Sequence, residues 1–227
     1  MSPELIGLYD LNGKVVVVVD IFRATSCMTA ALAHGVKSIT PVATLEEAKA
    51  LQEKGYVVAA ERGGSTVEGF DLSNSPFNYT EDQQAGKKLG MTTTNGTLAI
   101  SKSKDADEII IGSFLNLSAT IKYLKSTGKD VLVHCAGWKG KLCLEDTLYA
   151  GAVVELLKDT HETDCDAPLM AQSLYNESKN DLLGTLKNAA HALRLKGLGI
   201  QKDIAFCVTT DVYDVIPVLR GSALVRL

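Results

Sequence analysis

The chain has 227 residues, of which 46% are apolar and 22% are charged, and its formal net charge is −4. This length allows one large or two small globular domains, each with a core of its own. The lack of a basic surplus argues against nucleic acid as the main partner, because neutralising phosphates requires excess lysine and arginine. The sequence has no apolar run long enough to span a bilayer, so we expect no membrane partner.

The five cysteines are odd in number and scattered, and no two of them form a Cys-x-x-Cys pair. This spacing argues against a disulfide framework and against a structural zinc site. The N-terminal residues contain no basic segment followed by an apolar one, so they do not predict a signal peptide. We therefore expect reduced thiols and a cytoplasmic protein.

The first predicted element is a strand of five consecutive valines, Val15–Val19. Its β-branched, uncharged side chains suit a strand that is buried on both faces, as in the middle of a parallel sheet. Asp20 and Arg23 follow it directly and lead into a predicted helix over 24–33. A strand that ends at a carboxylate and turns into a helix is typical of the ligand-binding edge of an open α/β sheet. The candidates for capping this helix are Thr25 and Ser26.

Strands and helices continue to alternate after this unit. Strands are predicted over 36–42 and 56–60, and the helix between them covers 45–54. Thr44 stands at the capping position of that helix, and Glu47 completes a capping box. The order strand–helix–strand–helix–strand predicts an α/β fold with a parallel sheet and right-handed crossovers.

A long segment without regular pattern, 63–80, interrupts this alternation. Loops of this length in compact domains are usually functional or disordered, and the aromatic residues in this one favour the functional reading. Beyond it, strands are predicted at 89–92, 109–112, 131–137 and 204–209, with an edge strand near Pro217. Helices are predicted over 97–103, 115–127 and 144–158, and as two helices within 167–196 that are separated near Asn180.

The unit that begins at Asp130 echoes the first one. It has an apolar strand, a loop that contains charges and glycines, and a helix that begins with Glu145 and Asp146. The echo is architectural and is not a sequence repeat. No linker rich in proline or serine interrupts the chain. We therefore divide it into an N-terminal α/β half, 1–112, and a C-terminal α/β half, 113–227, which share an extensive interface.

Charged and polar residues gather at the ends of the predicted strands. Parallel strands deliver their carboxyl ends to one edge of a sheet, so these residues are expected to converge. Carboxylates from separate segments are what a magnesium ion needs, and arginines, hydroxyls and backbone amides are what a phosphate or sulfonate needs. The strand-end residues are Asp20 with Arg23, Glu61 with Arg62, Asp71, Thr92 to Asn95, Cys135, and Glu145 with Asp146.

Familiar catalytic signatures do not fit the sequence. Asp20 lacks the second aspartate of a D-x-D phosphatase motif, and the His134-Cys135 pair has Lys141 where an H-C-x5-R motif needs arginine. We find no phosphate-binding P-loop and no G-x-S-x-G elbow. The four histidines show no metal-ligand spacing. His134 stands in a predicted buried strand and is interpreted as a hydrogen-bonded core residue.

Eight sequence blocks, in order across nearly the whole chain, resemble the 2-phosphosulfolactate phosphatases (ComB-like proteins). One departure is Ser73, where glycine is expected in most relatives. The blocks are V-V-D-I-F-R-A-T-S at Val18–Ser26, P-V-A-T-L-E-E-A at Pro41–Ala48, E-R-G-G at Glu61–Gly64, G-F-D-L-S-N-S-P at Gly69–Pro76, T-T-T-N-G-T at Thr92–Thr97, G-S-F-L-N at Gly112–Asn116, C-A-G at Cys135–Gly137 and L-E-D at Leu144–Asp146.

This resemblance implies a magnesium-dependent hydrolase that removes phosphate from 2-phospho-3-sulfolactate and yields sulfolactate. It also implies a three-layer α/β/α sandwich made of two similar halves, which agrees with the architectural echo. In methanogens the reaction belongs to coenzyme M biosynthesis. The sequence shows no such source, so a related phosphorylated 2-hydroxy acid is the alternative substrate.

The expected site follows from these blocks together with the strand-end residues. The catalytic residues are expected to be Asp20, Arg23 and Glu61, with Asp20 as nucleophile or general base. The expected pool of Mg²⁺ ligands is Asp20, Glu61, Asp71, Glu145 and Asp146, of which not all can bind one ion. The expected substrate-binding residues are Arg23, Thr25, Ser26, Arg62, Gly63, Asn74, Thr94, Asn95, Gly96, Thr97 and Cys135.

A different class of function uses the same residues. A non-catalytic protein that binds a phosphorylated or sulfonated metabolite would need the same cations, hydroxyls and amides. Phosphate release from phosphorylated 2-hydroxy acids, with magnesium and then with chelator, separates the two hypotheses. The expected partner is in both cases a small phosphorylated organic acid. A homodimer is an option because it is the commonest soluble assembly.

Overall fold

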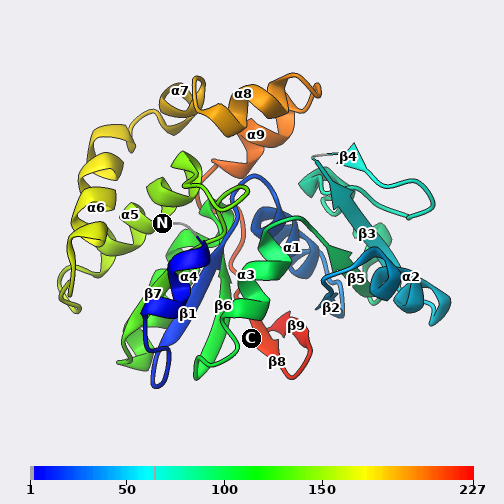
Figure 1. The fold of residues 1–227 in the computed structure, drawn as a ribbon, viewed down its shortest axis with the longest axis horizontal. Coiled ribbons are helices and arrows are strands. Elements are labelled where there is room, and N and C mark those ends of the chain that lie inside the picture. The colour runs from blue at the N-terminus through cyan, green and yellow to red at the C-terminus, as the bar shows by residue number, and fades with distance from the viewer. Residues whose placement is uncertain (1–2, 64) are drawn as a thin grey trace.

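The computed structural model describes residues 3–63 and 65–227, so Gly64, the last residue of the Glu61–Gly64 block, lies outside the described part. Within that part, nine strands form a single sheet in the order β4-β3-β5-β2-β9-β8-β6-β1-β7 (Figure 1). Four of the eight neighbouring strand pairs are parallel and the other four are antiparallel, and helices cover both faces of the sheet. The predicted α/β fold with a sheet between two helical layers is therefore confirmed, and six of the nine strands lie in parallel groups of a mixed sheet.

The elements have the following bounds. The strands are β1 Val15–Val19, β2 Ser38–Pro41, β3 Val57–Arg62, β4 Ser65–Thr66, β5 Lys88–Thr92, β6 Glu108–Gly112, β7 Val131–Cys135, β8 Pro217–Arg220 and β9 Ala223–Arg226. The α-helices are α1 Ala24–Ala33, α2 Leu45–Glu53, α3 Gly96–Lys102, α4 Leu117–Thr127, α5 Leu144–Leu157, α6 Asp166–Ser178, α7 Leu182–Leu186, α8 Ala190–Lys196 and α9 Gln201–Cys207. Short 3₁₀ turns cover Pro3–Leu8, Pro76–Asn78, Asp82–Gln84 and Phe114–Asn116.

The sheet contains two groups of three parallel strands. In one group β1 lies between β6 and β7, and in the other β5 lies between β2 and β3. The C-terminal hairpin β8–β9 joins the groups, because β8 pairs antiparallel with β6 and β9 pairs antiparallel with β2. The sheet is continuous across the predicted boundary between 112 and 113, and β1 of the first half pairs with β7 of the second.

Strand β1 lies at the centre of the first group, and all five of its valines are buried. Val16 and Val18 pack against α1 on one face of the sheet. Val15, Val17 and Val19 pack against α4 and α5 on the other face. The burial of both faces explains why this strand is a continuous apolar run. It also fixes the position of Asp20, the residue that follows the strand.

Helix α1 is buried on nearly all sides, and its residues are small or aliphatic. Thr25 and Ser26 do not cap it, contrary to our prediction. The Asp20 N–H donates to Thr25 Oγ1 over 3.0 Å, and Ser26 Oγ donates to the carbonyl of Ile21 over 3.0 Å. These hydroxyls bond back to the end of β1. They therefore hold the turn that contains Asp20, and the Asp20 carboxylate accepts the N–H of Ala24, the first residue of α1.

Three predictions for the C-terminal third of the chain are wrong. The segment 204–209 is not a strand, because α9 covers most of it. The buried residues Asp203, Ile204 and Cys207 have helical spacing, and a short apolar run cannot distinguish a strand from a helix by itself. The segment 167–196 forms three helices instead of two. Strand β8 is an interior strand, since it lies between β6 and β9.

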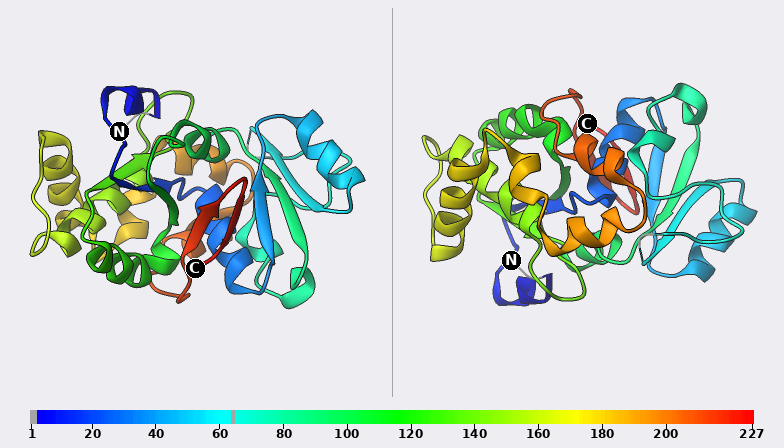
Figure 2. Two further views of the ribbon diagram at one scale, coloured as in Figure 1. Left: turned by 90° about the horizontal axis from the view of Figure 1, so that it is seen from below. Right: turned by 90° about the horizontal axis from the view of Figure 1, so that it is seen from above.

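The helices α7, α8 and α9 lie across the carboxyl ends of the central strands, as the views from the side and from above show (Figures 1 and 2). In Figure 1 this orange segment lies above β1 and β6, on the side where the chain leaves β1 for α1. Strand ends at this edge therefore lie beneath a helical cover. None of the helices in the described part of the chain combines the length and apolar character that crossing a bilayer demands.

His134 in β7 is a core residue, as predicted. Its Nδ1 lies 2.8 Å from Ser103 Oγ, and burial lowers the pKa of the ring to about 4. As the pH falls from 6.5 to about 4, the unfolded chain gains a proton that the folded chain does not. The free energy of unfolding therefore falls by up to about 3 kcal/mol.

The free energy of unfolding, measured with urea at neutral and acidic pH, should therefore depend less on pH for His134→Gln than for wild type. The half-buried His161, replaced in the same way, is the control and should leave that dependence unchanged.

Candidate active site

A narrow cleft lies between the carboxyl ends of the strands and helix α8. Its volume is about 20 Å³, which is room for about one water molecule. Six separate stretches of the chain contribute to it, including the turn after β1, the end of β3 and the turn after β5. The residues that line it are Asp20, Phe22, Arg23, Glu61, Asn74, Thr94, Asn95, Trp138, His191, Arg194 and Leu195.

Asp20 occupies the first position after β1 and is 7% exposed. Burial raises the pKa of its carboxyl group to about 6, the nearby His191 opposes this shift, and the acids Glu61 and Glu145 add to it. Close packing holds the carboxylate in place. A Cβ atom on Gly96 would lie 3.0 Å from Asp20 Oδ2 and 2.6 Å from the Cβ of Ala24, so only glycine fits where α3 begins.

Glu61 approaches the same cleft from the end of β3. It is buried, and its Oε2 accepts long hydrogen bonds of 3.4 Å from both the N–H and the hydroxyl of Thr94. Asn74, from the long irregular segment, is also buried. Its Oδ1 has no hydrogen-bond partner within residues 3–63 and 65–227. A buried oxygen without a partner is costly, and a bound ion or substrate donor would satisfy it.

Arg23, which ends the turn after β1, also lines the cleft. Its guanidinium forms a buried ion pair with Asp203 of α9, and both side chains are almost fully removed from solvent. This pair ties the C-terminal helical segment to the turn that contains Asp20. It also fixes the direction of the guanidinium, because Asp203 occupies one side of it.

A second guanidinium, that of Arg194, belongs to α8 and also lines the cleft. Its Nη1 donates to the carbonyl of Gly63 over 2.9 Å, and its Nη2 lies 2.8 Å from His191 Nε2. Its Cζ lies 4.9 Å from the centre of the Trp138 ring, which is a cation–π distance. Its buried Nε has no hydrogen-bond partner in the described part of the chain. Arg194 therefore keeps one donor for an anion.

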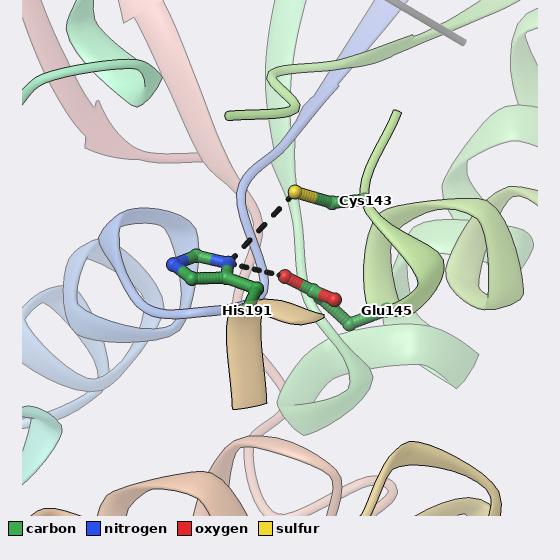
Figure 3. A group of neighbouring side chains, drawn as sticks. All are labelled: Cys143, Glu145 and His191. Atoms are coloured by element: carbon green, nitrogen blue, oxygen red, sulfur yellow. Dashed lines mark hydrogen bonds and ion pairs between the residues drawn. The ribbon is translucent and has the colours of Figure 1, made fainter. Parts of the chain in front are cut away.

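Helix α5 begins beside the cleft, and its first turn meets α8. Glu145 Oε1 lies 2.6 Å from His191 Nδ1, and Cys143 Sγ lies 3.8 Å from the same nitrogen (Figure 3). All three residues are buried. Oε2 of Glu145 has no hydrogen-bond partner among the described residues. The first turn of α5 thus fixes the orientation of a histidine ring that faces the cleft.

Asp146 has a different role from its neighbour. Its Oδ1 accepts the N–H of Ile21, and its Oδ2 accepts the N–H of Gly137, each over 2.9 Å. Burial and the nearby acids Glu145 and Asp20 raise the pKa of its carboxyl group. With both oxygens bound to backbone N–H groups, Asp146 joins the turn after β1 to the loop after β7.

Several residues of the predicted site lie outside the cleft. Asp71 is at the opposite end of β3 from Glu61, where its Oδ2 accepts the N–H of Val58 over 2.8 Å. Arg62 donates to Ala43 O, Glu61 O and Thr92 Oγ1, so it joins strand ends instead of facing the cleft. The side chains of Thr25 and Ser26 bond to the turn after β1, and Thr97 Oγ1 donates to Thr93 O. Gly63 and Gly96 border the cleft through their backbone.

Cys135 does not line the cleft, contrary to our expectation. It lines a larger cavity on the other side of β7, formed with α5 and α6. Its Sγ lies 3.5 Å from the carbonyl oxygen of Asp146, and burial raises the pKa of the thiol to about 11. A neutral, enclosed thiol is a poor nucleophile.

We therefore expect Cys135→Ser to retain most of the activity that the wild-type enzyme shows. The measurement is steady-state turnover beside a thermal unfolding curve, which separates loss of chemistry from loss of fold. Complete loss of turnover in a folded Cys135→Ser protein, with phosphate trapped on the wild-type cysteine, would instead support a thiol mechanism.

The sequence did not indicate the residues that α8, α9 and the loop after β7 contribute. His191 and Arg194 stand in a stretch whose only readable signal is helical periodicity, and Trp138 stands in an irregular loop. Glu145 and His191 are 46 residues apart. The helical periodicity places Arg194 one helical turn after His191, on the same face of the helix.

Comparison with known proteins decides which family this arrangement belongs to. The profile of the 2-phosphosulpholactate phosphatase family matches residues 1–222. This chain belongs to that family. The 2-phosphosulfolactate phosphatase relatives include proteins named "Probable 2-phosphosulfolactate phosphatase" from Caldanaerobacter subterraneus subsp. tengcongensis, Thermotoga petrophila and Synechocystis sp.. Their identities to this chain are 42%, 42% and 37%, over 94%, 93% and 95% of this chain and 90%, 92% and 92% of theirs.

The family assignment agrees with the resemblance of the eight sequence blocks. Four of these blocks contribute residues to the cleft: those at Val18–Ser26, Glu61–Gly64, Gly69–Pro76 and Thr92–Thr97. The block at Leu144–Asp146 supports the cleft from behind through Glu145 and Asp146. Five of the eight 2-phosphosulfolactate phosphatase blocks therefore meet at one place in this structure, although they are spread over most of the chain.

Proposed function

We propose that this protein is a magnesium-dependent phosphatase that hydrolyses 2-phospho-3-sulfolactate, or a related phosphorylated 2-hydroxy acid, to the free acid and phosphate. The observation that supports this most strongly is the cleft, where the buried carboxylates Asp20 and Glu61 face the guanidinium groups of Arg23 and Arg194. Carboxylates recruit a hard cation, and guanidinium groups recruit an oxyanion. A phosphatase acting on a small acidic phosphoester needs both.

The polar atoms without partners indicate how such a substrate would be bound. Nε of Arg194 is a buried donor and Oδ1 of Asn74 is a buried acceptor, and both belong to side chains that line the cleft. A phosphorylated, sulfonated acid presents several anionic oxygens. One of these oxygens would accept a hydrogen bond from Arg194. Another would accept a hydrogen bond from Arg23, which also forms the ion pair with Asp203.

The donor set of the cleft fits Mg²⁺. Asp20 and Glu61 would hold the ion. Burial raises the pKa of Asp20, and the nearby acids Glu61 and Glu145 add to this shift, so a bound cation would favour the ionised form of Asp20. When bound, the ion would neutralise phosphoryl oxygens and lower the pKa of a bound water. In this arrangement Asp20 either accepts a proton from the attacking water or attacks phosphorus itself, and a trapped phosphoenzyme would indicate the second course.

The cleft is closed to substrate in this structure. A volume of about 20 Å³ is far smaller than a phosphorylated three-carbon acid. The cover consists of Trp138 and the α8 residues His191, Arg194 and Leu195. We propose that this cover moves outward to admit substrate and closes over it, excluding water from the reaction.

The deciding experiment measures phosphate release from a panel of phosphorylated 2-hydroxy acids that includes 2-phospho-3-sulfolactate, first with Mg²⁺ and then with chelator. We expect turnover with Mg²⁺, its loss with chelator and its recovery on adding Mg²⁺ back. Calorimetric binding of the same acids without phosphate release would support the non-catalytic alternative. Turnover that is unaffected by chelator would contradict the magnesium assignment.

We also propose that the protein works in the cytoplasm. All five cysteines are free thiols, and four of them are buried, which suits a reducing compartment. A homodimer stays a prediction, and sedimentation equilibrium would test it.

A further inference from the structure

Three side chains with metal-binding atoms meet where the first turn of α5 faces α8. They are Cys143, Glu145 and His191, and their donor atoms all lie within 4.8 Å of one another. The dashed lines of Figure 3 converge on one atom, His191 Nδ1, from Glu145 Oε1 at 2.6 Å and from Cys143 Sγ at 3.8 Å. We call these three residues the Cys–Glu–His cluster.

The hydrogen bonds around His191 identify which of its nitrogens carries the proton. Arg194 has donors only, and its Nη2 lies 2.8 Å from His191 Nε2, so Nε2 is an acceptor. The proton of a neutral ring is then on Nδ1 and points at Glu145 Oε1. This proton occupies the centre of the Cys–Glu–His cluster, where a cation bound by all three groups would lie.

We propose that the Cys–Glu–His cluster is a binding site for one borderline-soft divalent transition metal ion, of which Zn²⁺ is the type. A thiolate and an imidazole select such an ion over Mg²⁺, which prefers oxygen ligands. Three protein ligands leave a fourth tetrahedral position open to water or to a ligand oxygen. The site is thus chemically distinct from the proposed Mg²⁺ position at Asp20 and Glu61.

The distances fit a tetrahedral ion with one small movement. Typical Zn–S and Zn–N bond lengths place sulfur and nitrogen ligands about 3.6 Å apart, close to the observed 3.8 Å between Cys143 and His191. The nitrogen-to-oxygen separation expected from the same bond lengths is about 3.4 Å, so Glu145 would withdraw by less than about 1 Å from its present 2.6 Å. Its Oε2, which lacks a partner in the described residues, is available as the ligand atom.

Three acids, Asp146, Glu145 and Asp20, lie near the Cys143 thiol, and their negative charge favours a cation in the cluster. Burial and the nearby acids Asp146, Glu145 and Asp20 raise the pKa of the Cys143 thiol, so without metal it stays protonated. Metal binding releases the thiol proton to solvent, and the proton on His191 Nδ1 moves to Nε2. The Nε2–H group then faces the donor Arg194, so the bond between Arg194 and His191 must break. Metal binding would thereby release a guanidinium donor into the cleft.

The test is a spectroscopic titration of metal-free protein with Co²⁺, followed by calorimetric titration with Zn²⁺, both with Mg²⁺ in large excess. We expect one Co²⁺ per chain and a near-ultraviolet thiolate-to-cobalt charge-transfer band. Cys143→Ser should abolish this band, and His191→Gln should weaken Zn²⁺ binding by roughly 100-fold or more. Cys165→Ser, the same change at the exposed cysteine, is the matched control and should keep the band.

Both titrations measure metal binding and not turnover. Their result therefore tests the Cys–Glu–His cluster whether or not the protein is a phosphatase. If Cys143→Ser does not fold, as circular dichroism would show, the wild-type titration still decides. Wild-type protein that binds Co²⁺ without a thiolate band overturns the proposal. A band that disappears in Cys165→Ser and persists in Cys143→Ser overturns it as well.

Discussion

Asp20→Asn is expected to reduce turnover of the phosphorylated acid by roughly 10³-fold or more, because the substitution removes the carboxylate that faces both the proposed metal and the phosphoryl group. The amide keeps the size of the side chain, and its oxygen can keep the backbone hydrogen bond from Ala24. The measurement is phosphate release at saturating Mg²⁺. Wild-type turnover in this variant would remove Asp20 from the mechanism.

The same variant should be at least as stable as wild type. The pKa of Asp20 in the folded protein is about 6, above its ordinary 3.8. As the pH rises from 3.8 to about 6, the unfolded chain loses a proton that the folded chain keeps, so the free energy of unfolding falls. A neutral amide avoids this loss, which amounts to roughly 3 kcal/mol at most. We therefore expect equal or higher Tm at neutral pH. Asp130→Asn, at an exposed aspartate after α4, is the control and should change neither turnover nor Tm.

Asp146→Asn is expected to damage both stability and turnover. The amide can accept only one of the two N–H groups that Asp146 now binds, and its NH₂ group would face the other, so a buried donor loses its partner. The expected destabilisation is about 2–3 kcal/mol. Turnover should fall as well, because the N–H of Ile21 belongs to the turn that positions Asp20.

The matched control for this effect is Asp107→Asn. Asp107 also accepts a backbone N–H, that of Gly13 over 2.9 Å, and it also pairs with a lysine, but it lies at the surface. Water can replace the lost bond there, so we expect a much smaller loss of unfolding free energy than in Asp146→Asn. Equal losses of unfolding free energy in Asp107→Asn and Asp146→Asn, measured by urea denaturation, would contradict the structural role of Asp146.

Local signals in the sequence were sufficient for much of the fold. The five valines of β1 predicted a strand buried on both faces, and the structure covers both faces with helices. Thr44 and Glu47 predicted a capping box, which α2 has. Each of these features depends on residues within a few positions of one another, where hydrogen bonding and periodicity act directly.

Predictions from local sequence were wrong where a polar side chain had several possible hydrogen-bond partners. Thr25 and Ser26 can cap a helix or bond back to a strand end, and in the folded protein both hydroxyls bond to the turn after β1. Asp146 can bind metal or backbone N–H groups. Its partners Ile21 and Gly137 come from loops that are distant in sequence, so its contacts depended on how these loops pack.

The sequence by itself determined the alternating strands and helices, the carboxylates and arginine at strand ends, and the family. Only the tertiary structure decided that α9 is a helix whose Asp203 binds Arg23, and that His191 meets Glu145 and Cys143. The physical reason is that a strand end positions its own residue, whereas a contact between distant helices exists only after the chain has packed. The cover over the cleft is such a contact, and so is the cluster that we propose binds a metal.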